Sequence, residues 1–202
     1  LSVAEAVANQ IATVIDWHGL RFFVVGKDNE TLQAIVLRST VPHYPNQRPE
    51  QFQIKVGLGL AGHVAASRVA EIVSDVRADP RGAKIPGTAD VDESMIVVPL
   101  VFEDAVLGVL ALIRLGRGAF DATDLRLAQI VGAQAAVALY NARQLEELER
   151  RGGALERRLA SQRQLLAITE RLLLTRDRSA VFEAIADTLA QVVPHDTLTI
   201  YL

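Results

Sequence analysis

The chain has no cysteine among its 202 residues, and this absence removes several kinds of chemistry. Without a thiol there is no disulfide, no thiolate nucleophile and no thiolate metal site. Long apolar runs are missing as well, since none approaches the roughly 20 residues that span a bilayer. No signal peptide opens the chain. We therefore expect a cytoplasmic protein that does not enter a membrane.

A strong charge of one sign is also missing. The formal net charge at pH 7 is −3, from 21 basic and 24 acidic residues, so neither nucleic acid nor an anionic membrane is expected as a partner. Half of the residues are apolar, which is enough for one full domain with additional material or for two small domains. Because the first residue is leucine, we expect the chain to be a piece of a longer protein.

Two stretches of the sequence have the pattern of β-hairpins. In 19–39, β-rich runs flank a polar turn at 27–30, and in 94–114 two apolar runs flank Glu103 and Asp104. Hairpins imply antiparallel pairing. The continuous apolar runs of 94–114 predict strands buried on both faces, in the middle of the sheet.

Helical spacing of apolar residues predicts the layer that covers this sheet. Ser2 is the expected N-cap of a helix at 2–15, and Asp121 or Thr123 is the expected cap of a helix from about 124 to 151. A short strand at 71–74 and proline-containing or polar loops at 40–52 and 75–93 complete the order of elements. The predicted fold class is α+β, with an antiparallel sheet and helices on its faces.

Three glycines between these elements have the spacing of a phosphate-binding loop. Gly57, Gly59 and Gly62 form G-x-G-x-x-G, and Asp75 follows at the distance of the acidic residue in a dinucleotide fingerprint. However, a hairpin precedes the loop where a βαβ unit would be needed, and no Lys-Ser/Thr follows. We interpret the glycines as a tight turn into a short helix. A Rossmann-type enzyme is the alternative, which a hairpin at 94–114 would exclude.

Four stretches in register resemble a GAF domain. They are "VGLGLAGHVAAS" (56–67), "EIVSDVRADPR" (71–81), "SMIVVPLVFEDAVLGVLALI" (94–113) and "FDATDLRLAQIVGAQAAVALYNA" (120–142). The resemblance covers residues 1 to about 143. It implies a sheet of about six antiparallel strands with helices behind it, and a small-molecule pocket on the other face, closed by the loops 40–52 and 75–93.

The resemblance also limits which ligand the pocket takes. GAF domains bind cyclic nucleotides, bilins, haem or small metabolites, or have no known ligand. Covalent bilin attachment and GAF-type methionine sulfoxide reduction both need a cysteine. Phe120 and Asp124 match the cyclic-nucleotide pattern, but Gly116-Arg117 stands where that pattern has Asn-Lys, which argues against a cyclic nucleotide. We therefore assign no cofactor.

Five residues are candidates for contact with a ligand: Asp75, Arg81, Ser94, His63 and Phe120. Asp75 and Arg81 either pair with each other inside their loop or meet a polar ligand. Ser94 either faces the pocket or begins a strand. His63 is the candidate axial ligand for haem, although a lone histidine is usually structural. No nucleophile–base pair and no metal-ligand spacing is present, so neither catalysis nor a metal site is expected.

The last helix continues into a heptad pattern. Its inward positions are Leu127, Val131, Gln134, Ala138, Asn141, Leu145, Leu148, Gly152, Leu155, Leu159, Gln162, Leu166, Thr169 and Leu173. We expect a helical linker at 144–160 that pairs with a second copy, giving a homodimer, and a break or hinge at Gly152-Gly153. The alternative is a single amphipathic helix that lies on its own domain.

An internal repeat indicates the nature of the segment after the linker. Residues 5–24 align with 183–202 in both a helix and the strand after that helix. We interpret 161–202 as the first helix and strand of a second, truncated GAF domain. Two functions remain open: a regulatory module that senses a small molecule, and a ligand-free dimerisation scaffold whose own side chains fill the pocket. A haem-based redox or gas sensor is a third hypothesis.

Overall fold

The computed structural model describes residues 3–41, 49, 52–82, 91–174 and 186–187. The chain divides into two compact units, Leu1–Gln144 and Leu145–Leu202. The first unit contains the sheet, and a long helix, α3 (Ala122–Leu174), begins in it. Among the described residues, no helix combines the length and apolar character that a bilayer crossing requires.

The sheet has six strands, and every described pairing between them is antiparallel. Their order across the sheet is β3-β2-β1-β6-β5-β4. The strands are β1 (Gly19–Val25), β2 (Thr31–Ser39), β3 (Gln53–Lys55), β4 (Glu71–Val73), β5 (Glu93–Phe102) and β6 (Ala105–Leu115). The predicted α+β class and the six-stranded sheet are confirmed. The Rossmann-type alternative is wrong, because residues 94–114 form the β5–β6 hairpin.

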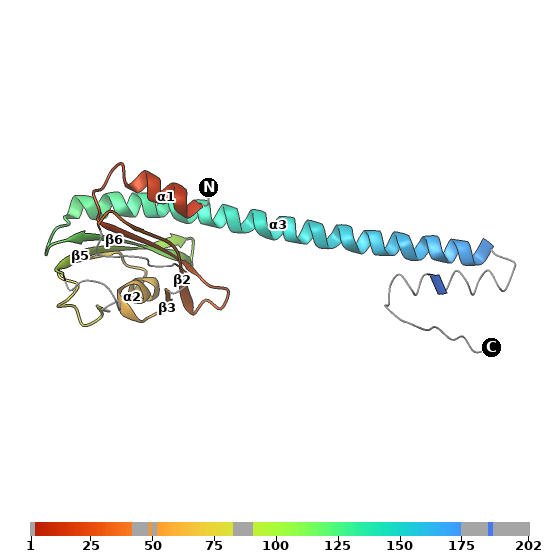
Figure 1. Cartoon of the computed structure of the whole chain (residues 1–202), viewed down its shortest axis with the longest axis horizontal. Helices are drawn as coiled ribbons and strands as arrows, with labels where there is room; N and C mark the ends of the chain where they lie inside the picture. The colour runs from red at the N-terminus through yellow and green to blue at the C-terminus, as the bar shows by residue number, and fades with distance from the viewer. Residues whose placement is uncertain (1–2, 42–48, 50–51, 83–90, 175–185, 188–202) are drawn as a thin grey trace. The chain divides into compact units, whose positions relative to one another are not determined.

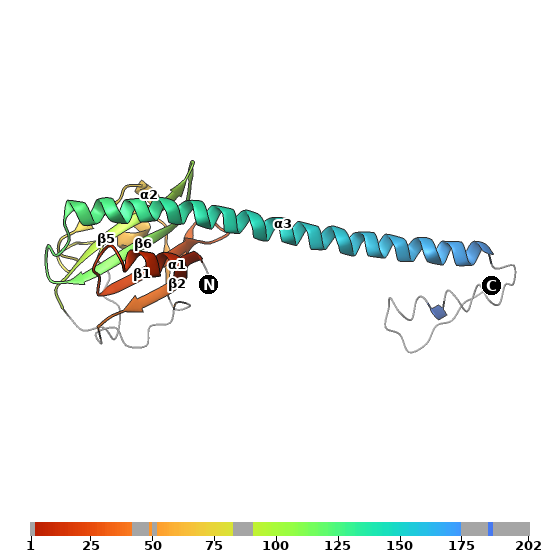
Figure 2. The ribbon, with the colours of Figure 1, turned by 90° about the horizontal axis from the view of Figure 1, so that it is seen from above.

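Helices lie on both faces of this sheet (Figures 1 and 2). Helix α1 (Val3–Ile11) and the first part of α3 cover one face, which we call the α1/α3 face; α2 (Gly59–Ser67) packs on the other, the α2 face. Alternation along β5 divides its side chains between the two cores: Ile96 and Val98 pack toward α1 and α3, and Met95 and Val97 toward α2. The prediction that 94–114 is buried on both faces is confirmed.

The glycine loop makes the turn into α2. Gly57 and Gly59 have φ values of 89° and 65°, which side chains with a Cβ rarely adopt. A Cβ on Gly62 would lie 2.3 Å from the carbonyl oxygen of Lys55 in β3, so the helix approaches the sheet edge too closely for any other residue. The glycines therefore serve the fold, as the interpretation from the sequence predicted.

Helix α3 is one element from Ala122 to Leu174, and the expected break at Gly152-Gly153 is wrong. Two glycines lower helix stability by about 1 kcal/mol each relative to alanine. That cost does not end a helix whose hydrogen-bonded turns continue on either side. Immediately before the glycines, Glu147 also pairs with Arg150 and Arg151 at i+3 and i+4.

The first part of the heptad pattern faces the sheet of its own unit. Val131 is buried in the core on the α1/α3 face, and Leu127 packs against that core. By contrast, Leu145, Leu148, Leu155, Leu159 and Leu166 are exposed. The single-helix alternative therefore describes the first turns of α3, and the pairing hypothesis applies only to the later ones.

Two predictions concern residues outside the described ones. Ser2, the expected cap of α1, lies there, and so do 175–185 and 188–202, which hold most of the interval assigned to a second GAF domain. Within that interval the structure shows α3 continuing to Leu174. The second domain stays a prediction.

Candidate ligand-binding face of the sheet

The α2 face is where the GAF resemblance implies a pocket. The loops expected to close it, 40–52 and 75–93, lie partly outside the described residues. What the structure describes is the sheet that forms the floor, the helix α2 over β5 and β6, and a rim of charged residues after β4 and β6.

Arg21 is the one charged residue of β1, and it projects from the α2 face. In β1, Leu20 and Phe22 pack on the α1/α3 face and Phe23 on the α2 face, so the alternation places Arg21 with Phe23. In the sheet register Arg21 lies between Leu37 of β2 and Ala111 of β6.

The surroundings of Arg21 act on its charge. Burial lowers the pKa of Arg21 to about 10, and the negative charge of Glu93 partly opposes this effect. A guanidinium remains protonated at neutral pH even so. The sequence reasoning did not select Arg21. The sequence feature that could have identified it is a single charged residue, two positions before Phe23, in an otherwise apolar strand.

Arg81 belongs to a tight ion-pair cluster on the rim. Its guanidinium contacts the carboxylate of Glu71 at 2.9 Å and that of Asp79 at 2.7 Å. These hydrogen bonds raise the pKa of Arg81 above its usual value, chiefly through Asp79, and the bond from Arg81 holds the pKa of Asp79 below its usual range. The cluster joins the start of β4 to the turn that follows it.

Asp75 takes a different partner. Its Oδ1 accepts backbone N–H bonds from Arg77 and Ala78, and its Oδ2 lies 3.1 Å from Nε of Arg117. Arg117 also contacts Asp92 at 3.0 Å, and this hydrogen bond raises the pKa of Arg117, with help from the charge of Asp75. The expectation that Asp75 and Arg81 pair with each other is wrong, because each pairs with other residues.

His63 lies on the outer side of α2 and is exposed. The neighbouring Leu60, Ala61 and Val64 face the sheet, so the imidazole points away from the floor. His18, just before β1, accepts the backbone N–H of Leu115 at 2.9 Å. Among the residues that the structure describes, no group of three potential metal ligands comes together.

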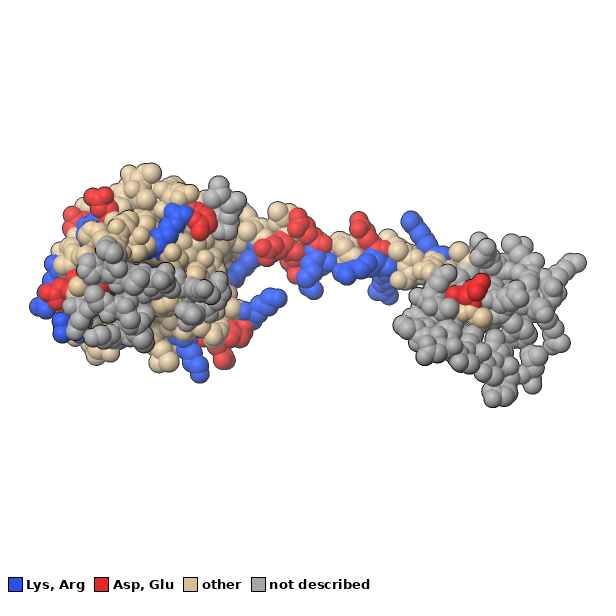
Figure 3. Space-filling model, viewed as in Figure 1, with Lys and Arg blue, Asp and Glu red and all other residues tan. Residues whose placement is uncertain are grey.

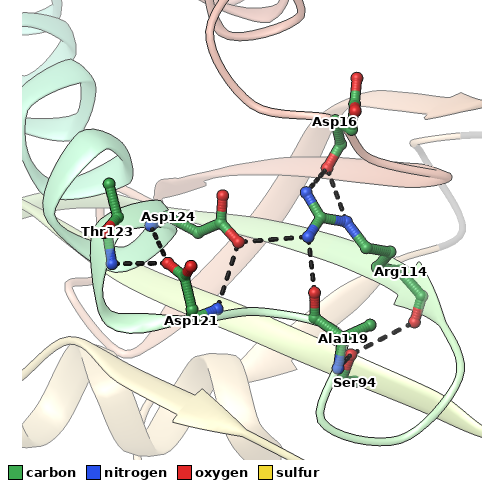
Figure 4. A network of polar contacts seen from close by, with 7 residues as sticks. All are labelled: Asp16, Ser94, Arg114, Ala119, Asp121, Thr123 and Asp124. Carbon is green, nitrogen blue, oxygen red and sulfur yellow. Dashed lines mark hydrogen bonds and ion pairs between the residues drawn. The ribbon is translucent and has the colours of Figure 1, made fainter.

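Ser94 and Phe120 lie on the opposite side of the sheet from Arg21. Ser94 is fully buried and lies on the α1/α3 face with Ile96. Its Oγ accepts the N–H of Ala119 at 3.2 Å and donates to the carbonyl of Arg114 at 3.5 Å (Figure 4). Phe120 is buried in the same core. The sheet therefore separates these two residues from a ligand on the α2 face.

Arg114 organises this second network (Figure 4). Its guanidinium donates to the carbonyl of Asp16 at 3.0 Å and to that of Ala119 at 2.6 Å, and contacts the Asp124 carboxylate at 3.1 Å. It also lies over the ring of Phe120, 4.3 Å from the ring centre. One side chain thus joins β6, the α1–β1 connection and the first turn of α3.

The connection between β6 and α3 contacts both networks. On the rim side, Gly116 donates to the carbonyl of Asp92 at 2.7 Å and Gly118 to that of Ser74 at 2.8 Å. On the α1/α3 side, the next residue, Ala119, donates to Ser94. The short segment 116–119 therefore ties the rim of the candidate site to the start of α3.

The comparisons with known proteins agree with this architecture. A family model described as "GAF domain" matches residues 1–139. Among solved structures, the GAF domain of Acinetobacter phosphoenolpyruvate-protein phosphotransferase is 17% identical, with a TM-score of 0.59 over 71% of this chain and 86% of that one. The comparison with curated proteins found no match.

Two further solved structures differ in what their names describe. The second GAF domain of DevS from Mycobacterium smegmatis is 25% identical, with a TM-score of 0.57 over 72% of this chain and 96% of that one. Free methionine-R-sulfoxide reductase from Neisseria meningitidis is 22% identical, with a TM-score of 0.58 over 71% and 81%. With the sheet order, the two helical layers and the family match to residues 1–139 in agreement, this chain belongs to the GAF domain family.

Proposed function

We propose that this chain is a small-molecule-sensing regulatory module of a larger cytoplasmic signalling protein. It binds its ligand on the α2 face, dimerises through α3 and passes the state of the site into that helix. GAF domains are generally regulatory modules of signalling proteins, and one similar structure is part of a methyl-accepting chemotaxis protein. The observation that carries the proposal is the pair of contacts that residues 116–119 make, on one side with the rim and on the other with the start of α3.

The proposed transmission follows those contacts. Asp75 and Asp92 stand at the two ends of the loop expected to close the pocket, and Arg117 contacts both. A ligand that holds this loop closed also holds Arg117 in place, and with it the connection to Ala119. Because Ala119 is bonded to Ser94 and Arg114, a change in the position of the loop reaches the first turn of α3.

Arg21 supports a particular class of ligand. Its side chain lies beside Leu37 and Ala111 on the α2 face, and the charge of Glu93 acts on it. We propose an apolar molecule that carries one anionic group, which contacts the guanidinium. In this proposal Asp75 and Arg81 shape the rim, while Ser94 and Phe120 position α3.

The experiment is native mass spectrometry of protein purified from its natural cells. We expect a bound acidic molecule in the wild type, loss of that molecule in Arg21→Met, and retention in Arg126→Met, whose arginine is exposed at the start of α3. Circular dichroism checks that each variant folds. A wild type without any bound molecule would favour the scaffold function. If a folded Arg21→Met variant retained as much bound molecule as the wild type, Arg21 would not be part of the site.

Two further measurements define the ligand and the path. Because Gly116-Arg117 replaces the Asn-Lys of the cyclic-nucleotide pattern, adding cAMP or cGMP should leave the melting temperature unchanged. Hydrogen exchange at residues 120–128 should differ between loaded protein and protein refolded without ligand. That difference should disappear in Arg117→Gln while binding persists. A difference that survives in Arg117→Gln would show that transmission takes another route.

A further inference from the structure

Glu93, the first residue of β5, lies on the same face of the sheet as Arg21. Met95 and Val97 pack toward α2, and alternation along β5 places Glu93 on that face with them. Strand β6 lies between β1, which carries Arg21, and β5. Burial lowers the pKa of Arg21, and the negative charge of Glu93 partly opposes that effect. The floor of the candidate site therefore already holds a carboxylate that attracts its guanidinium.

A second carboxylate on this face, that of Glu71, has a partner on the rim. The sheet register forms one row across four strands, which consists of Arg21, Ala111, Val97 and Glu71. Arg81 contacts Glu71 at 2.9 Å at the end of that row. Because this ion pair takes up the charge of Glu71, the carboxylate of β5 is the one that acts on the guanidinium of the floor.

The backbone at Glu93 belongs to the path toward α3. The carbonyl of Glu93 accepts the N–H of Val76 at 2.9 Å. The carbonyl of the preceding residue, Asp92, accepts the N–H of Gly116 at 2.7 Å. The position of the Glu93 side chain is therefore joined, within two residues of the chain, both to the rim after β4 and to the connection between β6 and α3.

We propose that Glu93 holds Arg21 while the site has no ligand, and that the anionic group of a ligand takes its place. Before binding, the attraction between the two side chains keeps the start of β5 close to the floor. After binding, the start of β5 moves with the loop that precedes it. The inference rests on the proposed ligand class. It adds the residue through which the charge of the ligand reaches the connection to α3.

Nearby charges decide this competition at Arg21. Among the described residues that are visible in Figure 3, basic and acidic side chains are mixed on the surface of the first unit. Water and salt screen such exposed charges over about 10 Å at 0.1 M salt, and they screen partly buried charges much less. Two carboxylates beside one partly buried guanidinium repel each other. A ligand that binds Arg21 through an anion therefore weakens the hold on Glu93.

Hydrogen exchange in the full chain, refolded without ligand, tests the pair directly. Arg21→Met and Glu93→Gln each remove one partner, so each should speed exchange at the amides of Val76 and Gly116 about fivefold. The double variant should add no further increase, because either change alone already breaks the pair. Glu103→Gln makes the same change of charge in the exposed turn after β5. This control should leave both amides unchanged.

Ala111→Asp tests the displacement by an anion. Ala111 pairs with Arg21 in the sheet register, so the new carboxylate stands for the anionic group of a ligand beside the same guanidinium. Exchange at Val76 and Gly116 should rise as it does in Glu93→Gln. Ala111→Asn has nearly the same size without the charge, and exchange at these two amides should stay slower in this control. Circular dichroism checks that both variants fold.

The outcomes separate this inference from the proposed ligand. Effects of Arg21→Met and Glu93→Gln that add in the double variant, or unchanged exchange in either single variant, overturn the inference and leave a bound acidic molecule in the wild type unaffected. Equal exchange in folded Ala111→Asp and Ala111→Asn also overturns it. If Ala111→Asp does not fold, the first set of variants decides. A wild type that carries no bound molecule overturns the ligand class, and with it the displacement.

Discussion

Arg21 and Arg114 show how the face of the sheet decides what a buried arginine does. Arg114 projects from β6 onto the α1/α3 face, where two carbonyls, a carboxylate and an aromatic ring surround it. Arg21 projects from the neighbouring β1 onto the α2 face, where burial lowers its pKa to about 10. The first fixes the joint between the sheet and α3. The second is the residue for which we propose a contact with the ligand.

Gly62 is a residue whose replacement by alanine we expect to be costly. In Gly62→Ala the new Cβ meets the backbone oxygen of Lys55 at 2.3 Å, and a backbone atom of β3 cannot rotate away. We expect a loss of about 1–3 kcal/mol in the free energy of unfolding, measured by urea denaturation. Gly153→Ala is the matched control, since nothing lies within 4 Å of its Cβ. Equal stability of Gly62→Ala and wild type would contradict the close approach of α2 to β3.

At the level of elements, the start of α3 is fixed by capping residues that are close to one another in the sequence. Asp121 accepts the N–H groups of Thr123 and Asp124, and Asp124 accepts the N–H of Asp121 in return. Of the two caps predicted, Asp121 is the one that forms. These bonds hold the pKa of Asp121 below its usual range. Arg114 holds the capped start on the sheet, and the position of the first turn of α3 is thereby fixed.

Glu147 should report on the integrity of α3 beyond the sheet. Its hydrogen bonds to Arg150 and then Arg151 lower the pKa of Glu147 to about 2. Because the pKa is lower in the helix than in the unfolded chain, the contribution to helix stability is complete above about 4.5 and is lost as the pH falls toward 2. Carboxyl NMR should show this low pKa. The pKa of Glu147 should rise in the double variant Arg150→Gln/Arg151→Gln. It should also rise in 1 M salt, which screens exposed charges. An ordinary pKa in the wild type at low salt would mean that the ion pairs do not form.

At the scale of the whole molecule, the chain has a unit with its own core and a second unit that begins within α3. The core of the first unit ends at Leu139, and Arg143 donates to the carbonyl of Val25 at 2.8 Å. The unit boundary falls between Gln144 and Leu145. The division proposed from the sequence, with a GAF domain at 1–143, a linker at 144–160 and a second domain from 161, stays a prediction beyond the GAF match at 1–139.

A chain that ends after Gln144 tests this division. Because every buried residue of the two cores precedes residue 140, we expect a cooperatively folded domain. Its melting temperature should lie within about 5 °C of the full chain, measured by circular dichroism. The control is the full chain with Leu148→Glu and Leu155→Glu, which we expect to be monomeric. Comparing the two melting temperatures separates the effect of losing the dimer from the effect of losing the segment after Gln144. A truncated chain without a cooperative transition would make the later part of α3 integral to the domain.

The sequence by itself determined the features that depend on neighbouring residues. Alternating apolar residues and turn residues specify the hairpins at 19–39 and 94–114. Gly57 and Gly59 specify the turn, because glycine tolerates the positive φ found there. Asp121 specifies the start of α3. The order of these hairpins, this turn and this helix along the chain allowed the α+β class and the family to be predicted, because each feature is a pattern of residues close together in the sequence. None of them needs knowledge of which distant residues meet.

Only the tertiary structure decided the partners and the faces. Arg81 pairs with Glu71, ten positions away, and Asp75 with Arg117, more than forty positions away, and charge alone does not choose among several nearby carboxylates. Ser94 and Arg21 are both polar residues in strands, but the packing of α3 and α2 places them on opposite faces. These partners and faces depend on packing between residues that are far apart in the chain. The sequence alone could not predict them for that reason.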